Sequence, residues 1–328
     1  MKIFMIGEAA NHAEKLAAGL NVPHEIVALP REAAFSDAFD AGIAPEDAVI
    51  SLRLKRPGGA CPPFRLLHVP GAGLDGIDYA ALSAGTTVCN VFEHEIPIAE
   101  YVLAAMLEWE IRAVEMRRGF SPESWPDIYR QRVPHGDIHG KTLGLVGFGR
   151  IGRAIASRAK AFGMRILALD AYASDLGPAD RILPPDQLDQ LLPEVDYLVL
   201  ACPLTEATNG LIGHAQLAAM KPTAVLINIS RAEIADEAAL FEALSGHVIG
   251  GACLDVWYRY PTGSDDRVEP SSFPFHELEN AVCTPHSSAW TRQLPQRRYA
   301  FMAANLDRLA RGETLLNVVR APAAEPAQ

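Results

Sequence analysis

The sequence predicts an α/β protein made of two doubly wound domains, each a parallel sheet with helices on both faces. Two observations support this fold class. Short runs of β-branched and apolar residues alternate with Ala- and Leu-rich helical stretches along the chain. The chain has 328 residues, a length that exceeds one ordinary hydrophobic core and favours two domains.

The composition is that of a globular protein, because 49% of the residues are hydrophobic and 21% are charged. No apolar run reaches the roughly 18 residues of a membrane span, and the first residues lack a signal-peptide pattern, so we expect a cytoplasmic location and no membrane partner. A net charge of -11 disfavours nucleic acid as a partner. Five widely spaced cysteines disfavour disulfides and a metal site.

The first series of elements covers residues 1–97. Residues 2–6 predict a strand, and the region from Glu8 to Leu20 predicts the helix that follows it. Further strands are expected at 48–52, 66–69 and 86–91.

The alternation changes at Pro97, which suits the first turn of a helix better than its interior. One long helix is predicted from Ala99 to Arg117. Residues 119–140 contain three prolines and little periodicity, so they are expected to form an arm or connection. Residues 321–328 predict a disordered tail.

A second series of strands begins after Lys141. Its members are apolar runs, each separated from the next by a helical or loop pattern, at 142–147, 165–170, 197–202, 224–230, 250–256 and 281–284.

Gly147, Gly149 and Gly152 form a G-x-G-x-x-G motif between the first strand of the second series and a helix. Gly147 allows a tight turn, Gly149 lets the backbone approach a pyrophosphate, and Gly152 lets helix and strand pack closely. The helix that starts at Arg150 and Ile151 offers its free N–H groups to phosphates. The motif therefore predicts a dinucleotide site.

Asp170 supplies the acidic residue that such a site needs, at the end of the next strand and 18 positions after Gly152. Its carboxylate can accept hydrogen bonds from ribose hydroxyls and would repel a 2′-phosphate. The residues that follow, 171–173, include no Arg or Lys. We therefore predict NAD as the cofactor.

These features resemble the D-2-hydroxyacid dehydrogenase family over nearly the whole chain. The resemblance is carried, in order, by HGKTLGLVGFGRIGRAIA, CPLTEATNGLIGHAQLAAMKPTAVLINISRAEIADEAAL, GACLDVW, TPHSSAWT and NLDRLARGETLLNVV. It implies a Rossmann cofactor domain, residues 98–294, inserted into a flavodoxin-like substrate domain formed by residues 1–97 and 295–328. It also implies a small-molecule substrate, a 2-hydroxy or 2-oxo acid, and a homodimer.

The resemblance assigns catalytic roles to two residues. Arg231, which ends the segment 228–231, matches the family's substrate arginine, and a fixed guanidinium can bind a carboxylate and polarise a carbonyl. His286 matches the family's acid/base, because a histidine that titrates near neutral pH can give or take the proton.

Further positions are implied to contact the cofactor or the substrate. Those around the cofactor are Pro203, Thr208, Ile229, Ser230, Asp255 and Ser288, with Asp255 near the nicotinamide carboxamide. Backbone N–H groups at Ala72 and Gly73 would hold the substrate carboxylate. Arg53, with Lys55 and Arg56, would receive a second anionic group, although a basic surface loop explains these three equally well. His94 is a further candidate for substrate contact.

The sequence departs from the family at one catalytic position. The family has a glutamate five positions after Asp255, where this chain has Tyr260. Either Tyr260 replaces that glutamate beside His286, or Glu269 folds back from a long loop to supply a carboxylate. The spacing of the residues before His286 favours Tyr260. The pKa of His286 would then lie lower than beside a carboxylate, which suits alcohol oxidation.

Two other functions stay open on the residues alone. Formate dehydrogenases of the same superfamily also lack the glutamate and share the segment 255–257, Asp-Val-Trp. An NAD-sensing binding protein on the same fold would need no catalysis, but Arg231 and His286 together favour an enzyme. The sequence names neither the substrate nor the preferred direction of reaction.

Overall fold

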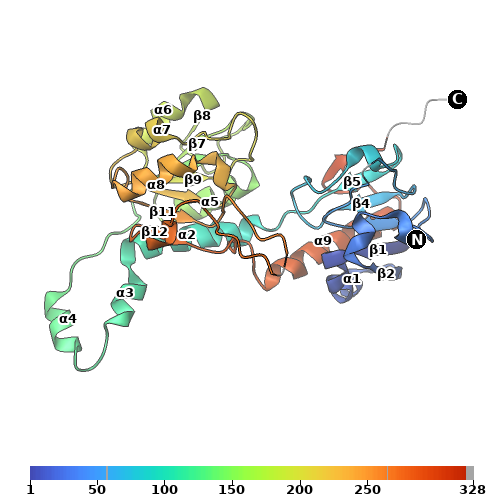
Figure 1. The fold of residues 1–328 in the computed structure, drawn as a ribbon, viewed down its shortest axis with the longest axis horizontal. Coiled ribbons are helices and arrows are strands. Elements are labelled where there is room, and N and C mark those ends of the chain that lie inside the picture. Colours follow the sequence, from blue (N-terminus) through green and yellow to red (C-terminus); the bar gives the residue numbers. More distant parts are fainter. Residues whose placement is uncertain (57, 264, 323–328) are drawn as a thin grey trace. The chain divides into compact units, whose positions relative to one another are not determined.

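The computed structural model describes residues 1–56, 58–263 and 265–322. The chain separates into two compact units (Figure 1), of which unit 2 is His94–Trp290 and unit 1 comprises Met1–Glu93 together with the chain from Thr291 onward. The domain boundaries assigned from the sequence, 97/98 and 294/295, stay predictions. The predicted disordered tail lies outside the described residues from 323 onward. In the described ranges, no helix is long and apolar enough to cross a membrane.

Unit 1 is built on a six-stranded sheet with the order β13-β5-β4-β3-β1-β2. The pairs among β1 to β5 are parallel, and β13 is antiparallel to β5. The strands are β1 (Lys2–Ile6), β2 (Glu25–Leu29), β3 (Ala48–Ile50), β4 (Leu66–His68), β5 (Thr87–Cys89) and β13 (Val318–Arg320). The sequence prediction lacked β2 and β13.

Both faces of this sheet carry buried apolar residues. Side chains alternate along β1, so Ile3 and Met5 join the core beneath α1 (Ala13–Gly19) and α9 (Gln293–Ala310), whereas Phe4 and Ile6 join the core on the other face. The predicted helix from Glu8 to Leu20 is wrong in its first half, where the chain forms a 3-10 helix, Gly7–His12, before α1 begins.

Unit 2 contains a seven-stranded sheet with the order β12-β11-β10-β9-β6-β7-β8. All neighbouring strands are parallel. They are β6 (Thr142–Val146), β7 (Arg165–Leu169), β8 (Arg181–Leu183), β9 (Tyr197–Leu200), β10 (Val225–Asn228), β11 (Gly251–Leu254) and β12 (Ala281–Cys283). The short strand β8 was not predicted.

Helices cover both faces of the second sheet, as the fold class requires. One face packs against α2 (Glu95–Ile111) and α5 (Arg150–Ala161), through residues such as Met106 and Ile155. The other face packs against α6 (Leu188–Leu191), α7 (His214–Ala219) and α8 (Glu237–Ser245), through residues such as Leu217 and Leu240. The predicted doubly wound α/β fold is confirmed.

The single helix predicted from Ala99 to Arg117 is also wrong. Helix α2 ends at Ile111, because Arg112 adopts a left-handed conformation with φ of 52°, and α3 (Ala113–Arg118) starts afresh after it. The predicted irregular arm contains α4 (Trp125–Gln131), whose proline lies in its first turn, where a proline is tolerated. Figure 1 shows α3 and α4 projecting from the sheet of unit 2.

Candidate active site

The glycine motif forms the turn between β6 and α5. Gly147 has φ of 99°, and a Cβ there would lie 2.7 Å from the backbone of Ala201. A Cβ on Gly152 would lie 2.3 Å from the carbonyl oxygen of Gly147, whereas a Cβ on Gly149 would meet no atom within 4 Å. The turn is therefore closed toward the protein and open at Gly149, where α5 begins with Arg150 and Ile151. This arrangement fits the phosphates of a dinucleotide.

Asp170 directly follows β7 and joins the glycine turn to it. Its carboxylate accepts hydrogen bonds from the N–H groups of Phe148 and Tyr172, both at 2.7 Å, and of Ala173 at 2.9 Å. A carboxylate has about four acceptor positions, so these three leave capacity for a ligand. Because Asp170 is only half-buried, it fits the ribose-binding role predicted for it.

Arg231 follows β10 on a turn that is built by Asn228. The Asn228 side chain, 2% exposed, donates to the carbonyl of Arg231 at 3.0 Å and accepts from the N–H of Ser230 at 3.1 Å. The Arg231 side chain is exposed, and its Nη1 donates to the carbonyl of Ser230 at 2.8 Å. Sequence reasoning did not single out Asn228, although it begins the segment that located Arg231.

His286 lies just beyond β12, with φ of 54°, which is uncommon for a residue other than glycine. Its Nδ1 is 2.7 Å from the hydroxyl oxygen of Tyr260. That hydroxyl oxygen also accepts from the N–H of Trp257 at 3.0 Å. Glu269 is exposed, and within the described ranges no hydrogen bond or ion pair joins it to His286. The structure thus gives His286 a neutral partner.

Partial removal from water lowers the pKa of His286, and of the two nearby charges Asp255 opposes this shift while Arg231 reinforces it. Withdrawal from water also raises the pKa of Tyr260, so its hydroxyl stays protonated. A neutral hydroxyl can donate to Nδ1 or accept from it, whereas a carboxylate can only accept. His286 can therefore carry its proton on either ring nitrogen.

The loop that carries His286 is fixed by hydrogen bonds to Asp255, which is 0% exposed. Its carboxylate accepts from the Thr284 hydroxyl at 2.5 Å and from the N–H groups of Ser287 and Ser288, both at 2.8 Å. Because Thr284 donates its single hydroxyl proton to Asp255, the Tyr101 hydroxyl, 2.8 Å from that oxygen, must be the donor to Thr284. Asp255 is thus enclosed and fully engaged by this loop, and its place near the nicotinamide carboxamide stays a prediction.

Three supports of this loop were missed by sequence reasoning. Tyr101 and Thr284 form the buried chain that ends on Asp255, and the Trp257 indole donates to the carbonyl of Thr284 at 2.9 Å. Thr284 and Trp257 are each two positions along the chain from a residue that a motif located, His286 and Asp255 respectively. Tyr101 lies 183 positions from Thr284 in the sequence, so only the tertiary structure could bring the two together.

The other predicted cofactor positions lie on the loops after β9 and β10 and on the His286 loop. The Thr208 hydroxyl donates to the carbonyl of Pro203 at 2.7 Å, which closes the loop after β9. The Ser230 hydroxyl donates to the carbonyl of Cys202, which joins the two loops. Ile229 and Ser288 are both buried.

In unit 1, the predicted carboxylate-binding backbone at Ala72 and Gly73 forms a loop between β4 and β5. The Asn90 side chain donates to the carbonyl of Ala72 at 3.1 Å, and Gly73 is exposed. Arg53 is exposed. It lies against this loop, since a Cβ on Gly76 would be 3.1 Å from the Cγ of Arg53.

The basic cluster predicted near Arg53 needs a correction at Arg56. Arg56 is 5% exposed, and its Nη2 donates to the carboxylate of Asp40 and to the carbonyl of Ala33, both at 2.9 Å. A buried guanidinium already paired with a carboxylate cannot serve an incoming anion. His94, the remaining predicted substrate residue, belongs to unit 2, where its carbonyl accepts from the N–H of Ile98 at 3.2 Å at the start of α2.

A cavity of about 660 Å³ adjoins His286 in unit 2. Tyr260 and His286 form part of its wall, and most of the rest is apolar. The apolar lining comes mainly from the long loop after β11, with Trp257, Pro261, Val268, Pro270, Phe273 and Phe275.

Comparison with known proteins shows which proteins this chain is similar to. Residues 103–288 match the family model described as D-isomer specific 2-hydroxyacid dehydrogenase, NAD binding domain. The chain is 36% identical over 265 residues to a glyoxylate reductase of Korarchaeum cryptofilum, covering 79% of this chain and 77% of that protein. It is 34% identical over 266 residues to a glycerate dehydrogenase of Methylorubrum extorquens, covering 79% and 80%.

A solved structure supports the same fold. The D-lactate dehydrogenase of Lactobacillus jensenii, determined with NAD+, superposes with a TM-score of 0.72 at 26% sequence identity, over 97% of this chain and 99% of that one.

Proposed function

Because this chain belongs to the D-isomer specific 2-hydroxyacid dehydrogenase family, we propose that it interconverts a small 2-hydroxy acid and the matching 2-oxo acid, using NAD(H). One observation carries the proposal. His286 has Nδ1 2.7 Å from the Tyr260 hydroxyl, on a loop that buried Asp255 holds in place. A fixed histidine that is neutral at physiological pH is suited to take a proton from a substrate hydroxyl.

The other predicted residues divide the remaining tasks. Arg231, exposed on its asparagine-built turn, would bind and polarise the substrate. The N–H groups at Ala72 and Gly73 would hold the substrate carboxylate, and the glycine turn with Asp170 would hold the cofactor. When bound, NAD accepts or supplies the hydride.

Tyr260 is a positioning residue in this proposal, because it acts through His286. Its hydroxyl orients the imidazole without placing a negative charge beside it. Burial lowers the pKa of His286, and the Tyr260 hydroxyl adds no charge that would raise it, so the neutral ring prevails near pH 7. This state favours removal of a proton, and therefore oxidation of the 2-hydroxy acid.

The test follows NADH absorbance with a panel of 2-hydroxy and 2-oxo acids. In His286→Gln we expect kcat to fall by about 10²- to 10⁴-fold, the usual contribution of a general acid or base, with NADH affinity unchanged. His214→Gln is the matched control, since His214 is an exposed histidine paired with Glu242 on the surface. Full activity in His286→Gln would contradict the assignment.

The same panel separates the alternative functions. Tight NADH binding without turnover of any acid would favour an NAD-sensing binding protein. Oxidation of formate alone would favour the formate-type reading.

We further propose that the chain forms a homodimer through its arm. Helices α3 and α4 and the residues next to them expose large apolar side chains, including Phe120 at 61%, Trp125 at 48%, Tyr129 at 50% and Val133 at 82%. Exposed apolar surface on this scale is typical of a protein interface. Sedimentation of the full chain should give twice the chain mass, and a monomer would contradict the proposal. The cytoplasmic location stays a prediction.

A further inference from the structure

Unit 1 contains a cavity of about 300 Å³ at the carboxyl ends of β1, β2 and β3. Strand order reverses there, because β2 lies on one side of β1 while β3 and the strands after it lie on the other. In open α/β sheets, the crevice at such a reversal is where ligands bind. The position alone makes this cavity a candidate ligand site.

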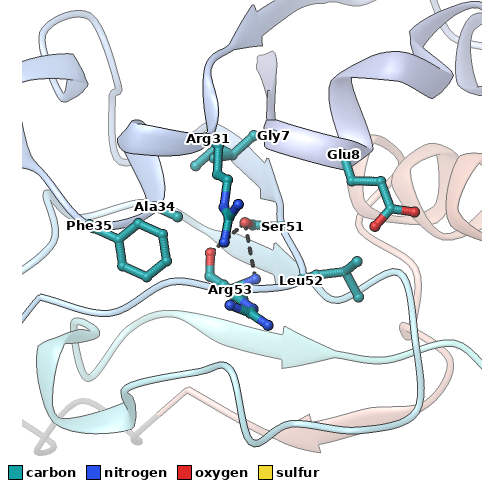
Figure 2. Close-up of a pocket in the computed structure, with 9 residues that line it drawn as sticks. Gly7, Glu8, Arg31, Ala34, Phe35, Ser51, Leu52 and Arg53 are labelled. Carbon is teal, nitrogen blue, oxygen red and sulfur yellow. Dashed lines mark hydrogen bonds between the residues drawn. The ribbon is translucent and has the colours of Figure 1, made fainter. Parts of the chain in front are cut away.

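Two arginines line the cavity, from different parts of the chain. Arg31 follows β2, and Arg53 follows β3. Figure 2 shows the Arg31 side chain reaching toward Ser51 and Arg53. Neither guanidinium has a hydrogen bond or ion pair within residues 1–56, 58–263 and 265–322. Both are therefore available to an incoming group, unlike the buried and paired Arg56.

One residue of the lining fixes the backbone of Arg53. Ser51, 2% exposed, donates from its hydroxyl to the carbonyl of Arg53 at 2.5 Å, which fixes the backbone at that residue. Among the described residues that line the cavity, Glu8 is the only acidic one, and Figure 2 shows its carboxylate directed away from both arginines. The site thus presents positive charge in a chain whose net charge is -11.

The cavity adjoins the loop that carries Ala72 and Gly73. A Cβ on Gly71 would lie 3.4 Å from Leu52, and the Leu54 N–H donates to the carbonyl of Gly76 at 2.9 Å. The segment from Ser51 to Leu54 therefore has the cavity on one side and this loop on the other. Arg53 also lies against this loop, since a Cβ on Gly76 would be 3.1 Å from its Cγ, so a substrate held by its carboxylate at Ala72 and Gly73 would lie on the loop that Arg53 contacts.

We propose that Arg31 and Arg53 form a subsite for a second anionic group, a carboxylate or a phosphate, at the distal end of the substrate. The inference rests on the proposed function and narrows it to 2-hydroxy and 2-oxo acids with a terminal anion. Paired guanidinium groups bind such anions by charge-assisted hydrogen bonds.

The first experiment compares substrates that differ only in the terminal group. 2-Oxoglutarate and 2-oxopentanoate form the carboxylate pair, and 3-phosphooxypyruvate and 3-hydroxypyruvate form the phosphate pair. The unaltered enzyme should prefer the anionic member of at least one pair by about tenfold or more in kcat/KM, the usual worth of one charge-assisted hydrogen bond. The pair with the larger ratio identifies the anion. Equal kcat/KM within both pairs would overturn the proposal.

Variants then assign the preference to the two arginines. Arg31→Gln and Arg53→Gln should each remove most of it by lowering kcat/KM for the anionic substrate only. Arg65→Gln is the matched control, because Arg65 is an exposed arginine of unit 1 that does not line the cavity. A loss that is equal for neutral and anionic substrates in the arginine variants would overturn the proposal.

A binding measurement separates this proposal from the proposed function. Inorganic phosphate is titrated by calorimetry into the full chain and into the double variant Arg31→Gln, Arg53→Gln. Binding to the former and none to the latter supports the subsite even if no 2-oxo acid is turned over. Equal binding to both, or no binding to either, counts against the subsite even in an active dehydrogenase.

Discussion

Each of the two sheets reverses its strand order at one place, yet the side chains beside the two reversals carry opposite charges. In unit 2 the reversal lies between β6 and β9, beside a turn of glycine backbone and the carboxylate of Asp170. In unit 1 it lies between β1 and β3, beside the guanidinium groups of Arg31 and Arg53, which have no partner among the described residues. Topology decides where a site can form, and side chains decide the charge of what it holds.

The two units also use a histidine in different ways. His68 on β4 is 0% exposed, and burial lowers its pKa to about 4. The Asn305 amide lies 3.2 Å from its Nε2, so this nitrogen accepts the hydrogen bond and the ring is neutral. His286 stands at the surface with a hydroxyl on one nitrogen. The first histidine is a part of the core, and the second is the residue that we propose to exchange protons with the substrate.

The largest expected effect comes from the glycine turn of unit 2. In Gly147→Ala the new Cβ would lie 2.7 Å from the Ala201 backbone at a positive φ, so unit 2 should lose roughly 2–4 kcal/mol of stability. In Gly149→Ala the methyl group meets no protein atom within 4 Å, so stability should be unchanged while NADH affinity falls by about tenfold or more.

Tryptophan fluorescence measures both effects, because all four tryptophans lie in unit 2. Unfolding curves report the stability of that unit, and NADH titration reports the affinity. Unchanged NADH affinity in Gly149→Ala would show that the phosphates bind elsewhere.

A smaller effect concerns the partner of His286. Tyr260→Glu would place a carboxylate beside Nδ1, which stabilises the protonated ring and raises the pKa of His286. Oxidation needs the neutral ring, so the acid limb of kcat/KM should move upward by about 1–2 pH units from its position below 6.5. Tyr260→Phe, which adds no charge, is the control and should leave the limb near its original pH. If the acid limb of kcat/KM lies at the same pH in Tyr260→Glu as in the unaltered protein, the contact between residue 260 and His286 is contradicted.

The smallest effect concerns His68 and the stability of unit 1. As the pH falls below about 6.5, the unfolded chain binds a proton at this residue, whereas the folded chain, with a pKa of about 4, does not. Stability should therefore fall from pH 6.5 toward 4, by at most about 1.4 kcal/mol per pH unit. His68→Gln keeps an acceptor for Asn305 and removes this contribution. Hydrogen exchange of β4 at pH 6.5, 5.5 and 4.5 measures it, and equal slopes in both proteins would refute the prediction.

The errors in the predicted fold follow a physical pattern. The missed strands β2, β8 and β13 are all edge strands, which bury one side against a neighbour and leave the other exposed. Strands β8 and β13 have three residues each, which is too short for a clear pattern, whereas β2 contains the apolar run 26–29 that the prediction passed over. The break at Arg112 was missed for another reason, since a single left-handed residue leaves the helical periodicity on either side intact.

Candidate site residues were predictable where a short motif contains them. This holds for the glycine turn, Asp170, Arg231 and His286, because each lies in a short segment with a recognisable sequence and these segments follow one another in the expected order. Arg31 was not predictable, because nothing in its segment distinguishes it from other surface arginines. Arg56 was misplaced for the converse reason, since a sequence does not reveal that its guanidinium is buried against Asp40.

The sequence by itself determined the doubly wound fold, the dinucleotide motif and the identity of the residue at the family's glutamate position. These are local properties, which depend on the periodicity of apolar residues and on short spacings between residues. The tertiary structure alone decided that Tyr260 lies against His286, that Asp255 is enclosed beneath the histidine loop, and that Arg31 and Arg53 share one cavity. Such contacts join residues far apart in the chain, and only the packing of the sheets and loops brings them together.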